Sequence, residues 1–269
     1  MPEQDRTARF IQALPKYLLL FTILLLLTLY ILIWLVDFKQ VYVSGVTEWT
    51  HQFPAPIFWL HIFREGLLVE NLQWLFLGLS AVLSYLIYIK HSSQRNNVKL
   101  GWLLLATGLL IMLLEDSINL RYKLSYFLSL HFYDGNIGNY EWFKSSFRTI
   151  VELSVYAILG SVMISSYYYL FRSGMNKFAF RYLTGGFIVY AIAAFCSATR
   201  NIGSWYEIVG INILDRLTEG LDLFWNAESM IFLLSPLGFY FMDHVVEESL
   251  ELIGATLILC FLISVIQNK

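Results

Sequence analysis

Carboxylic acids within apolar segments are the residues of this chain that could do chemistry. Glu115 and Asp116 lie near the end of one apolar stretch, and Glu251 lies near the start of another, so each is expected about one helical turn inside a membrane. A charged side chain costs about 2.5–3.5 kcal/mol at the centre of a membrane helix, and such residues are usually functional. These acids are therefore the first candidates for a site.

The last apolar segment carries the largest group of polar side chains. Spacings of three and four residues predict that four of them share one helix face: His244, Glu247, Glu248 and Glu251. Glu115 and Asp116 would meet this face if the third and the sixth spanning helices were neighbours.

Glu152 and three arginines, Arg121, Arg148 and Arg200, are predicted at the same boundary as these acids. Buried charges are normally paired, so one interpretation is a structural clamp in which acids and arginines pin the ends of the helices. A second interpretation is a binding site for a small ligand, a lipid headgroup, a cation or a proton, formed by the clustered carboxylates.

A third interpretation is a metal site, for which His244, Glu247 and Glu251 are weak candidates, supported by Glu115 and Asp116. The chain has one His-x-x-Glu unit here, whereas di-iron bundles use paired Glu-x-x-His units. No cofactor is predicted, because none of the five histidines lies in mid-membrane and no apolar segment has a central lysine. The Walker, GxSxG and HExxH motifs are absent as well, so no catalytic residue is predicted.

The composition identifies the class of protein that holds these acids. Of the 269 residues, 58% are hydrophobic and 14% are charged, and the mean hydropathy is +0.61. Soluble domains have about 25% charged residues. These values exclude a disordered chain, a protein that binds nucleic acid through a basic surface, and an ordinary cytosolic enzyme. The expected partner is the lipid bilayer, with other membrane subunits or a second copy of the chain as further candidates.

Six segments have the ~20 mostly apolar residues that a membrane-spanning helix needs. They predict an all-α membrane protein with a single polytopic transmembrane domain over residues 1–269, arranged as three hairpins with long outer loops. The spans are predicted at about 17–36, 71–89, 100–119, 152–171, 182–199 and 245–266.

A seventh span at 221–242 is the alternative. This stretch is apolar, but it contains Asp222, Asn226 and Glu228, and Pro236 interrupts it. The charge distribution favours six spans. The predicted inner segments then carry ten Lys or Arg and two acids, and the rest of the chain carries eight Lys or Arg and eighteen acids. Because Lys and Arg collect on the cytoplasmic side, both termini are predicted in the cytoplasm, with the chain in the plasma (inner) membrane.

Aromatic and amphipathic segments are predicted on the outer side. Seven of the eight Trp lie at or beyond the outer boundary, where Trp is typical of the interface. Polar residues recur every three or four positions between residues 211 and 226, which predicts an amphipathic interfacial helix. A second interfacial segment is predicted near 56–65. Small residues in the fifth span, including Gly185, Gly186 and Ala194, predict that this helix is central.

The sequence therefore predicts an acidic, aromatic-capped cavity that faces outward and binds a small ligand, a lipid or a partner subunit without catalysis. One alternative is a secondary transporter that couples protons or cations through its intramembrane carboxylates. The other is a membrane enzyme that acts on a lipid-linked substrate. The inner halves of the spans contain no acid, which counts against a transport route across the membrane.

Overall fold

The computed structural model describes residues 2–38, 59–64, 66–90, 96–132, 141–174, 176–200, 202–218 and 238–267, and these residues are helical with short turns and without strands. Six helices in these ranges are long and apolar enough to cross a membrane: Gln12–Asp37, Leu68–Lys90, Asn96–Ile118, Thr149–Phe171, Lys177–Thr199 and Gly238–Gln267. Their length and composition support the predicted multi-pass membrane protein. The alternative seventh span falls mostly on residues outside the described ranges, as does the second half of the 211–226 segment. Of the segment near 56–65, residues 59–64 are described, and their position at a membrane interface stays a prediction.

In chain order the helices are α1 (Pro2–Ile33), the π-helix η1 (Trp34–Phe38), α3 (Leu60–Phe63), α4 (Leu68–Lys90), α5 (Asn96–Ile118), α6 (Leu120–Phe132), α7 (Glu141–Phe171), α8 (Lys177–Thr199), α9 (Trp205–Thr218), the π-helix η2 (Phe241–Glu247) and α11 (Glu248–Gln267).

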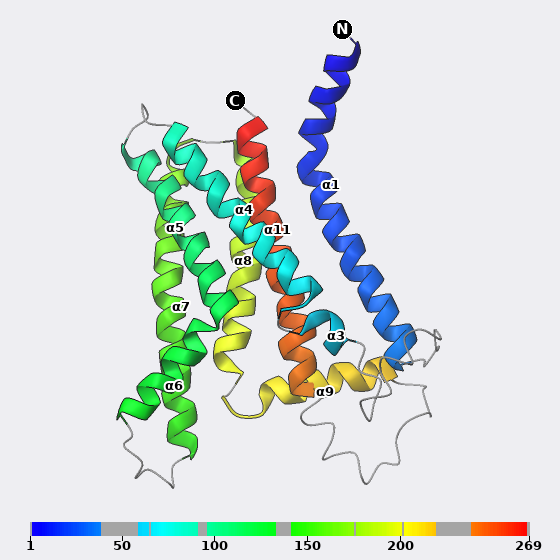
Figure 1. The fold of residues 1–269 in the computed structure, drawn as a ribbon, viewed down its shortest axis with the longest axis vertical. Coiled ribbons are helices and arrows are strands. Elements are labelled where there is room, and N and C mark those ends of the chain that lie inside the picture. Colours follow the sequence, from blue (N-terminus) through cyan, green and yellow to red (C-terminus); the bar gives the residue numbers. More distant parts are fainter. Residues whose placement is uncertain are drawn as a thin grey trace.

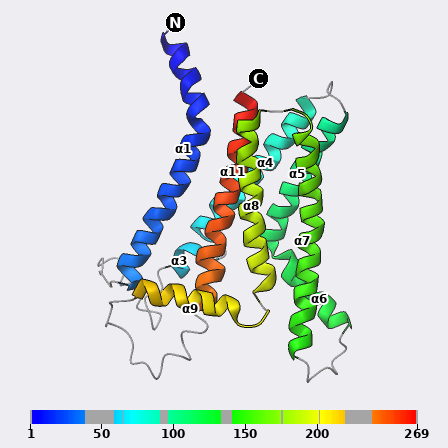
Figure 2. The same cartoon turned by 180° about the vertical axis from the view of Figure 1, so that it is seen from behind.

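The two ends of the bundle differ in what they carry. The N- and C-termini lie at the same end, and α3, α6 and α9 lie towards the other, where α9 runs across the bundle (Figures 1 and 2). We call these the terminal end and the acidic end. The described part of the 211–226 segment belongs to α9, in which Leu214 is buried and Asp215 and Arg216 are exposed. Its position at a membrane interface remains a prediction.

The last helix occupies the centre of the bundle. It packs against α1, α4 and α8. In the most apolar 18-residue stretch of its span, 72% of the residues are buried, compared with 28% in the corresponding stretch of α8. The prediction that the fifth span is the central one is therefore wrong. Gly186 of α8 faces Gly254 and Ile258 of α11, whereas Ile192 and Phe195 of the same helix are exposed.

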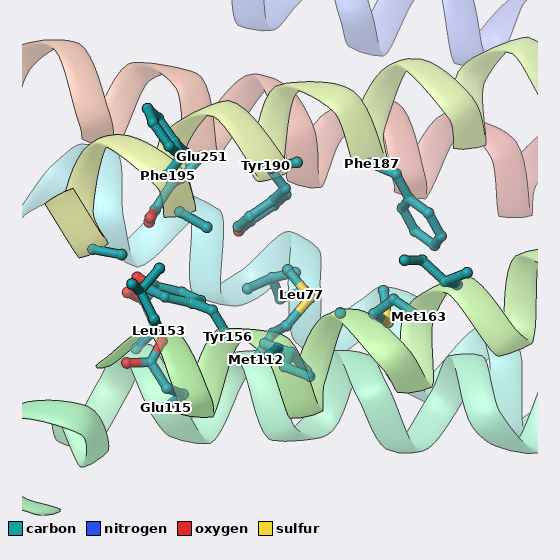
Figure 3. A pocket seen from close by; sticks show the side chains of 18 residues that line it. Leu77, Met112, Glu115, Leu153, Tyr156, Met163, Phe187, Tyr190, Phe195 and Glu251 are labelled. Carbon is teal, nitrogen blue, oxygen red and sulfur yellow. The ribbon is translucent and has the colours of Figure 1, made fainter. Parts of the chain in front are cut away.

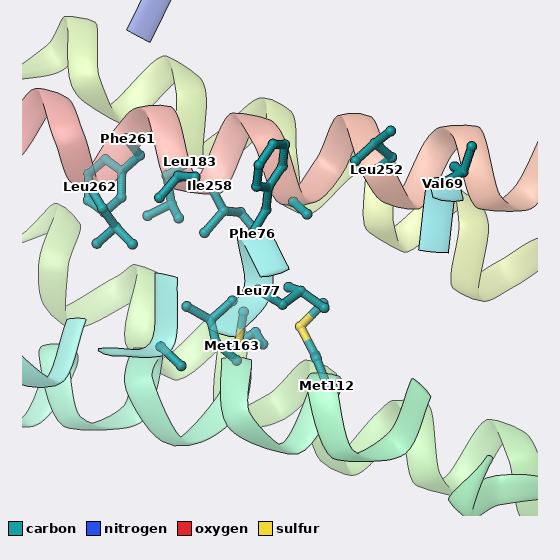
Figure 4. Packing of buried hydrophobic residues seen from close by; sticks show 14 of the residues in the cluster. Val69, Phe76, Leu77, Met112, Met163, Leu183, Leu252, Ile258, Phe261 and Leu262 are labelled. Carbon is teal, nitrogen blue, oxygen red and sulfur yellow. The ribbon is translucent and has the colours of Figure 1, made fainter. Parts of the chain in front are cut away.

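The apolar core lies between α11, α4 and α5. Leu252, Ile258 and Phe261 of α11 are completely buried beside Leu77 of α4, and Met112 of α5 closes the cluster (Figure 4). A helix that is apolar on all sides is expected in the interior of a bundle, and α11 fits this rule after Glu251.

The first helix lies at the periphery and packs along α11 (Figures 1 and 2). Two hydroxyl pairs join the helices: Thr22 and Thr256 at 3.1 Å, and Tyr30, which donates to Ser249 at 2.7 Å. The opposite face of α1 presents exposed Leu, Ile and Phe side chains, as expected for a helix that faces lipid.

Candidate functional site

Buried acids gather near the acidic end of the bundle, contributed by four spanning helices. In the described part of the chain, six glutamates are at most 8% exposed: Glu70, Glu115, Glu152, Glu247, Glu248 and Glu251. Asp116 is half-buried. The predicted acids are thus on one level of the bundle, and Glu70 of α4 joins them.

A bend between α5 and α6 supplies the cation for Glu115. Asn119 adopts a positive φ of 50°, a conformation that Asn tolerates better than most residues, and this turns the chain after α5. Arg121 forms an ion pair with Glu115 and donates to Ser197 of α8 at 2.6 Å. Its guanidinium also lies 4.9 Å from the centre of the Tyr156 ring. Arg121 therefore connects α6 with α5, α7 and α8.

Burial lowers the pKa of Arg121, but Glu115 and then Glu247 and Glu251 outweigh this effect, so its pKa lies above the ordinary value. Arg121 is thus a permanent positive charge in the midst of the acids. The predicted clamp applies to this residue, which is buried against an acid and cannot lose its proton.

Asp116 and Glu251 are held by neutral donors instead. Gln73 of α4 donates to Asp116 at 2.6 Å and to Glu251 at 2.7 Å, and the Trp74 indole donates to Asp116 at 2.9 Å. The sequence predicted that α5 and α11 would have to be neighbours. Of the described helices, α4 is the one that packs closely against both, and its Gln73 side chain bridges the two acids.

The second arginine lies at the end of α8. Arg200 forms an ion pair with Asp243, and Tyr206 of α9 donates to Glu247 at 2.9 Å. Burial lowers the pKa of Arg200, and Asp243 and Glu247 more than offset this and raise it. Burial and the neighbouring Glu247 raise the pKa of Tyr206. Both groups therefore keep their protons and hold the start of the last span against α8 and α9.

The start of the last span is a π-helix, which changes the predicted helix face. His244 packs its ring against Tyr240 at 5.9 Å and Trp59 at 6.4 Å, whereas Glu247 accepts from Tyr206 of α9. A π-helix has a wider turn than an α-helix, so the spacing of three between His244 and Glu247 does not place them on one face. The prediction that His244 shares a face with Glu247 is therefore wrong, whereas Glu248 and Glu251 lie in α11 and interact with each other and with Glu247 through their charges.

Glu248 lies among other acids. The charged groups that act on it most strongly are Glu251, Asp116, Glu70 and Glu247, and its Oε2 atom has no hydrogen-bond partner among the described residues. Glu152 of α7 is 1% exposed and lies close enough to Glu115 and Arg200 to interact with their charges.

The side chains proposed as metal ligands do not converge. Within the described ranges, no group of three or more His, Cys, Asp or Glu is arranged to hold a metal ion. The His244 ring packs on Tyr240 and Trp59. Arg148 belongs to α7, but its side chain lies outside the described part of the structure.

A pocket of about 410 Å³ begins at these acids and extends between α4, α5, α7, α8 and α11. The carboxylates of Glu115 and Glu251 lie at one end of it, and Met163 and Phe187 lie at the other (Figure 3). Asp116 also lines the acidic end. The pocket is therefore amphipathic, with oxygen acceptors at one end and an apolar channel beyond them.

Several residues of the site were not predicted from the sequence. Gln73 and Tyr190 lie in apolar segments, and Tyr206 lies in a predicted loop. A polar residue within an apolar span was a visible signal for Gln73, and the same rule that selected Glu115 could have selected it. Tyr190 and Tyr206 gave no signal, because tyrosine is common in membrane helices and at interfaces.

No protein-family model, curated protein or solved structure matches this chain.

Proposed function

We propose that this protein is a non-enzymatic integral membrane protein that binds an amphiphilic, lipid-like ligand in the acidic pocket. The observation that carries the proposal is the shape and chemistry of that pocket. Its volume of about 410 Å³ is within the range of ~300–1,000 Å³ that small-molecule sites occupy. Its polar groups are confined to one end, as the headgroup and chain of an amphiphile would require.

The pocket opens sideways, towards the space that lipid would fill. Leu153 and Ile164 of α7 and Phe195 of α8 line it, yet they are 41%, 69% and 63% exposed on the surface of the bundle. These two helices also pack only loosely against each other, whereas α7 packs closely on α5 and α8 packs closely on α11. An apolar ligand could therefore enter between α7 and α8 from the bilayer without crossing water.

The acidic end would lie near the outer surface of the plasma (inner) membrane if both termini are cytoplasmic, as the distribution of Lys and Arg favours. Trp59, Trp74 and Trp205 all belong to this end of the bundle. The Trp74 indole, which donates to the pocket acid Asp116, would then lie at the outward end of the pocket, with the headgroup near the interface and the chain deeper.

The alternative of coupled transport receives less support. Towards the terminal end the described core is filled by completely buried side chains, including Leu105, Leu183 and Phe261, with Trp102 stacked on Phe261 at 5.9 Å. A transport route usually has ionisable groups along it, and the acids of the spans lie near one end of the bundle.

The proposal is tested by filling the pocket with a side chain of the protein itself. Gly160 lines the pocket, and a Cβ atom added there would meet nothing within 4 Å. We expect Gly160→Leu to occupy the channel without disturbing the fold. Mass spectrometry of the protein purified from membranes under native conditions should show a bound amphiphile in the wild type and loss of most of it in this variant.

The matched control is Ser161→Leu, which adds the same side chain at the next position, where residue 161 is exposed. It should retain the bound amphiphile. If the Gly160→Leu protein keeps as much of it as the wild type and the control, the pocket is not the binding site and the proposed function is wrong.

A further inference from the structure

We infer that the ligand carries a positively charged headgroup, with the chemistry of a long-chain amine. This inference rests on the proposed function and names the class of ligand. It is carried by three features of the acidic end of the pocket: its balance of charge, its supply of hydrogen-bond acceptors, and the aromatic rings beside the acids.

Acidic side chains outnumber basic ones at this end. Glu115, Asp116 and Glu251 line the pocket, and Arg121 is ion-paired with Glu115. Among the described residues, no Lys or Arg forms an ion pair with Asp116 or Glu251, which accept from Gln73 and Trp74; Arg121 acts on them only from a greater distance. Buried charge is costly without an opposite charge, so a cation in the pocket would be strongly favoured.

Further acids lie behind the pocket. Glu70 and Glu248 act electrostatically on Asp116 or on each other, and both are at most 8% exposed. A phosphate or carboxylate headgroup would have these acids, and no unpaired described cation, as its neighbours.

The described hydrogen bonds to the two pocket acids use one oxygen of each carboxylate, Oδ2 of Asp116 and Oε2 of Glu251. Carboxylate oxygens accept hydrogen bonds and do not donate them when ionised. The Tyr190 hydroxyl is buried and lies next to Gln73, close to both acids. Tyr190 lines the pocket beside Glu251 (Figure 3). An ammonium group has three donors and no acceptor, which matches this set.

Aromatic rings favour the same chemistry. Tyr156 and Tyr190 both line the pocket near the acids (Figure 3), and the Tyr156 ring already has the guanidinium of Arg121 at 4.9 Å. Tyrosine faces attract cations, and the attraction is larger when the cation is desolvated. The apolar channel beyond these rings provides space for one hydrocarbon chain.

The test compares four probes with the purified full-length protein in maltoside micelles at pH 7: dodecylamine, dodecanol, dodecanoate and butylamine. The first three differ only in headgroup, and butylamine has the headgroup without the long chain. Binding is measured from the concentration of each probe that raises the thermal unfolding temperature. We expect dodecylamine to act at a concentration at least about tenfold lower than the other three, because a hydrogen bond to a charged group contributes that much.

Glu251→Gln tests the origin of that preference. The variant should weaken the binding of dodecylamine about tenfold or more and leave the binding of dodecanol unchanged, since the amide retains the shape of the carboxylate but not its charge. Asp215→Asn is the matched control, because Asp215 is an exposed acid on α9 outside the pocket lining. It should bind all four probes as the wild type does.

The outcomes separate this inference from the proposed function. If dodecanol or dodecanoate acts at the same concentration as dodecylamine, or if Glu251→Gln leaves dodecylamine unaffected, the positive headgroup is wrong and the pocket remains a lipid site. If butylamine equals dodecylamine, the site takes soluble amines and the lipid source is wrong. If Gly160→Leu changes the effect of none of the probes, the proposed function itself is overturned.

Discussion

The two ends of the bundle are held together in different ways. At the terminal end the helices approach through small residues and stacked rings. Ser166 of α7 donates to the Gly101 carbonyl of α5 at 3.0 Å, and Trp102 stacks on Phe261 at 5.9 Å. At the acidic end the helices are joined by side-chain hydrogen bonds and ion pairs, among them Gln73 with Glu251 and Arg121 with Glu115.

This difference shows that helix packing here does not require buried charge. The terminal end reaches complete burial of Trp102 and Leu183, and its apolar segments contain no acid. Every acid at the other end has a cost in desolvation that close packing would not have. Among the described acids that line the pocket, Asp116 and Glu251 form no ion pair with an arginine, so their presence requires a functional explanation.

The predicted ion-pair clamp and the proposed binding site are accordingly two groups of residues within one cluster. Arg121 with Glu115, and Arg200 with Asp243, form ion pairs that join helices. Asp116 and Glu251 face the pocket and accept from neutral donors. The first group should govern stability and the second should govern binding.

Breaking the clamp should have the largest effect. In Arg121→Gln the buried carboxylate of Glu115 loses its cation, and removal of one partner of a buried ion pair typically costs about 3–5 kcal/mol. We expect a strongly lowered unfolding temperature in detergent. Lys123→Gln is the control, because Lys123 is an exposed cation on the same helix. Equal stability of the two variants would contradict the assignment of Arg121 to the clamp.

Disturbing the packing towards the terminal end should have an intermediate effect. A Cβ atom on Gly186 would lie 2.8 Å from Ile258 Cγ1 and 3.0 Å from the carbonyl oxygen of Gly254. Overpacking costs about 1–3 kcal/mol, so Gly186→Val should lower the unfolding temperature clearly.

The neighbouring glycine is a matched control for that substitution. At Gly185 an added Cβ would meet only Leu257 Cδ1 at 3.5 Å, an ordinary contact. Gly185→Val should therefore be nearly as stable as the wild type. If Gly185→Val and Gly186→Val lowered the unfolding temperature equally, the cost would come from helix propensity and not from the contact between α8 and α11.

Removing the charge of a pocket acid should have the smallest effect on stability. Glu251→Gln keeps an oxygen that can accept from Gln73, and no ion pair is broken, so the cost should stay below about 1 kcal/mol. Glu115→Gln provides the contrast, because it leaves Arg121 without its paired acid. If Glu251→Gln lowered the stability as much as Glu115→Gln does, Glu251 would belong to the clamp.

The sequence by itself determined which segments are helices able to span a membrane and that their acids lie at one level. Both properties are local. About 20 apolar residues give a helix the length of the hydrocarbon layer, and the rise per residue then sets the depth of Glu115, Asp116 and Glu251. Any arrangement of the six helices would have kept the acids of the spans away from the terminal end.

The tertiary structure alone decided which helix is central, which acids have an arginine and where the pocket lies. Apolar side chains do not specify which face of a spanning helix points into the protein, since every face can contact lipid or another helix. The position of α4 between α5 and α11 brings Gln73 to both acids, and the wider turn of η2 separates Glu247 from His244. The amphipathic pocket exists because α7 and α8 pack on different partners and leave space between them, a property of the assembled bundle that no single segment contains.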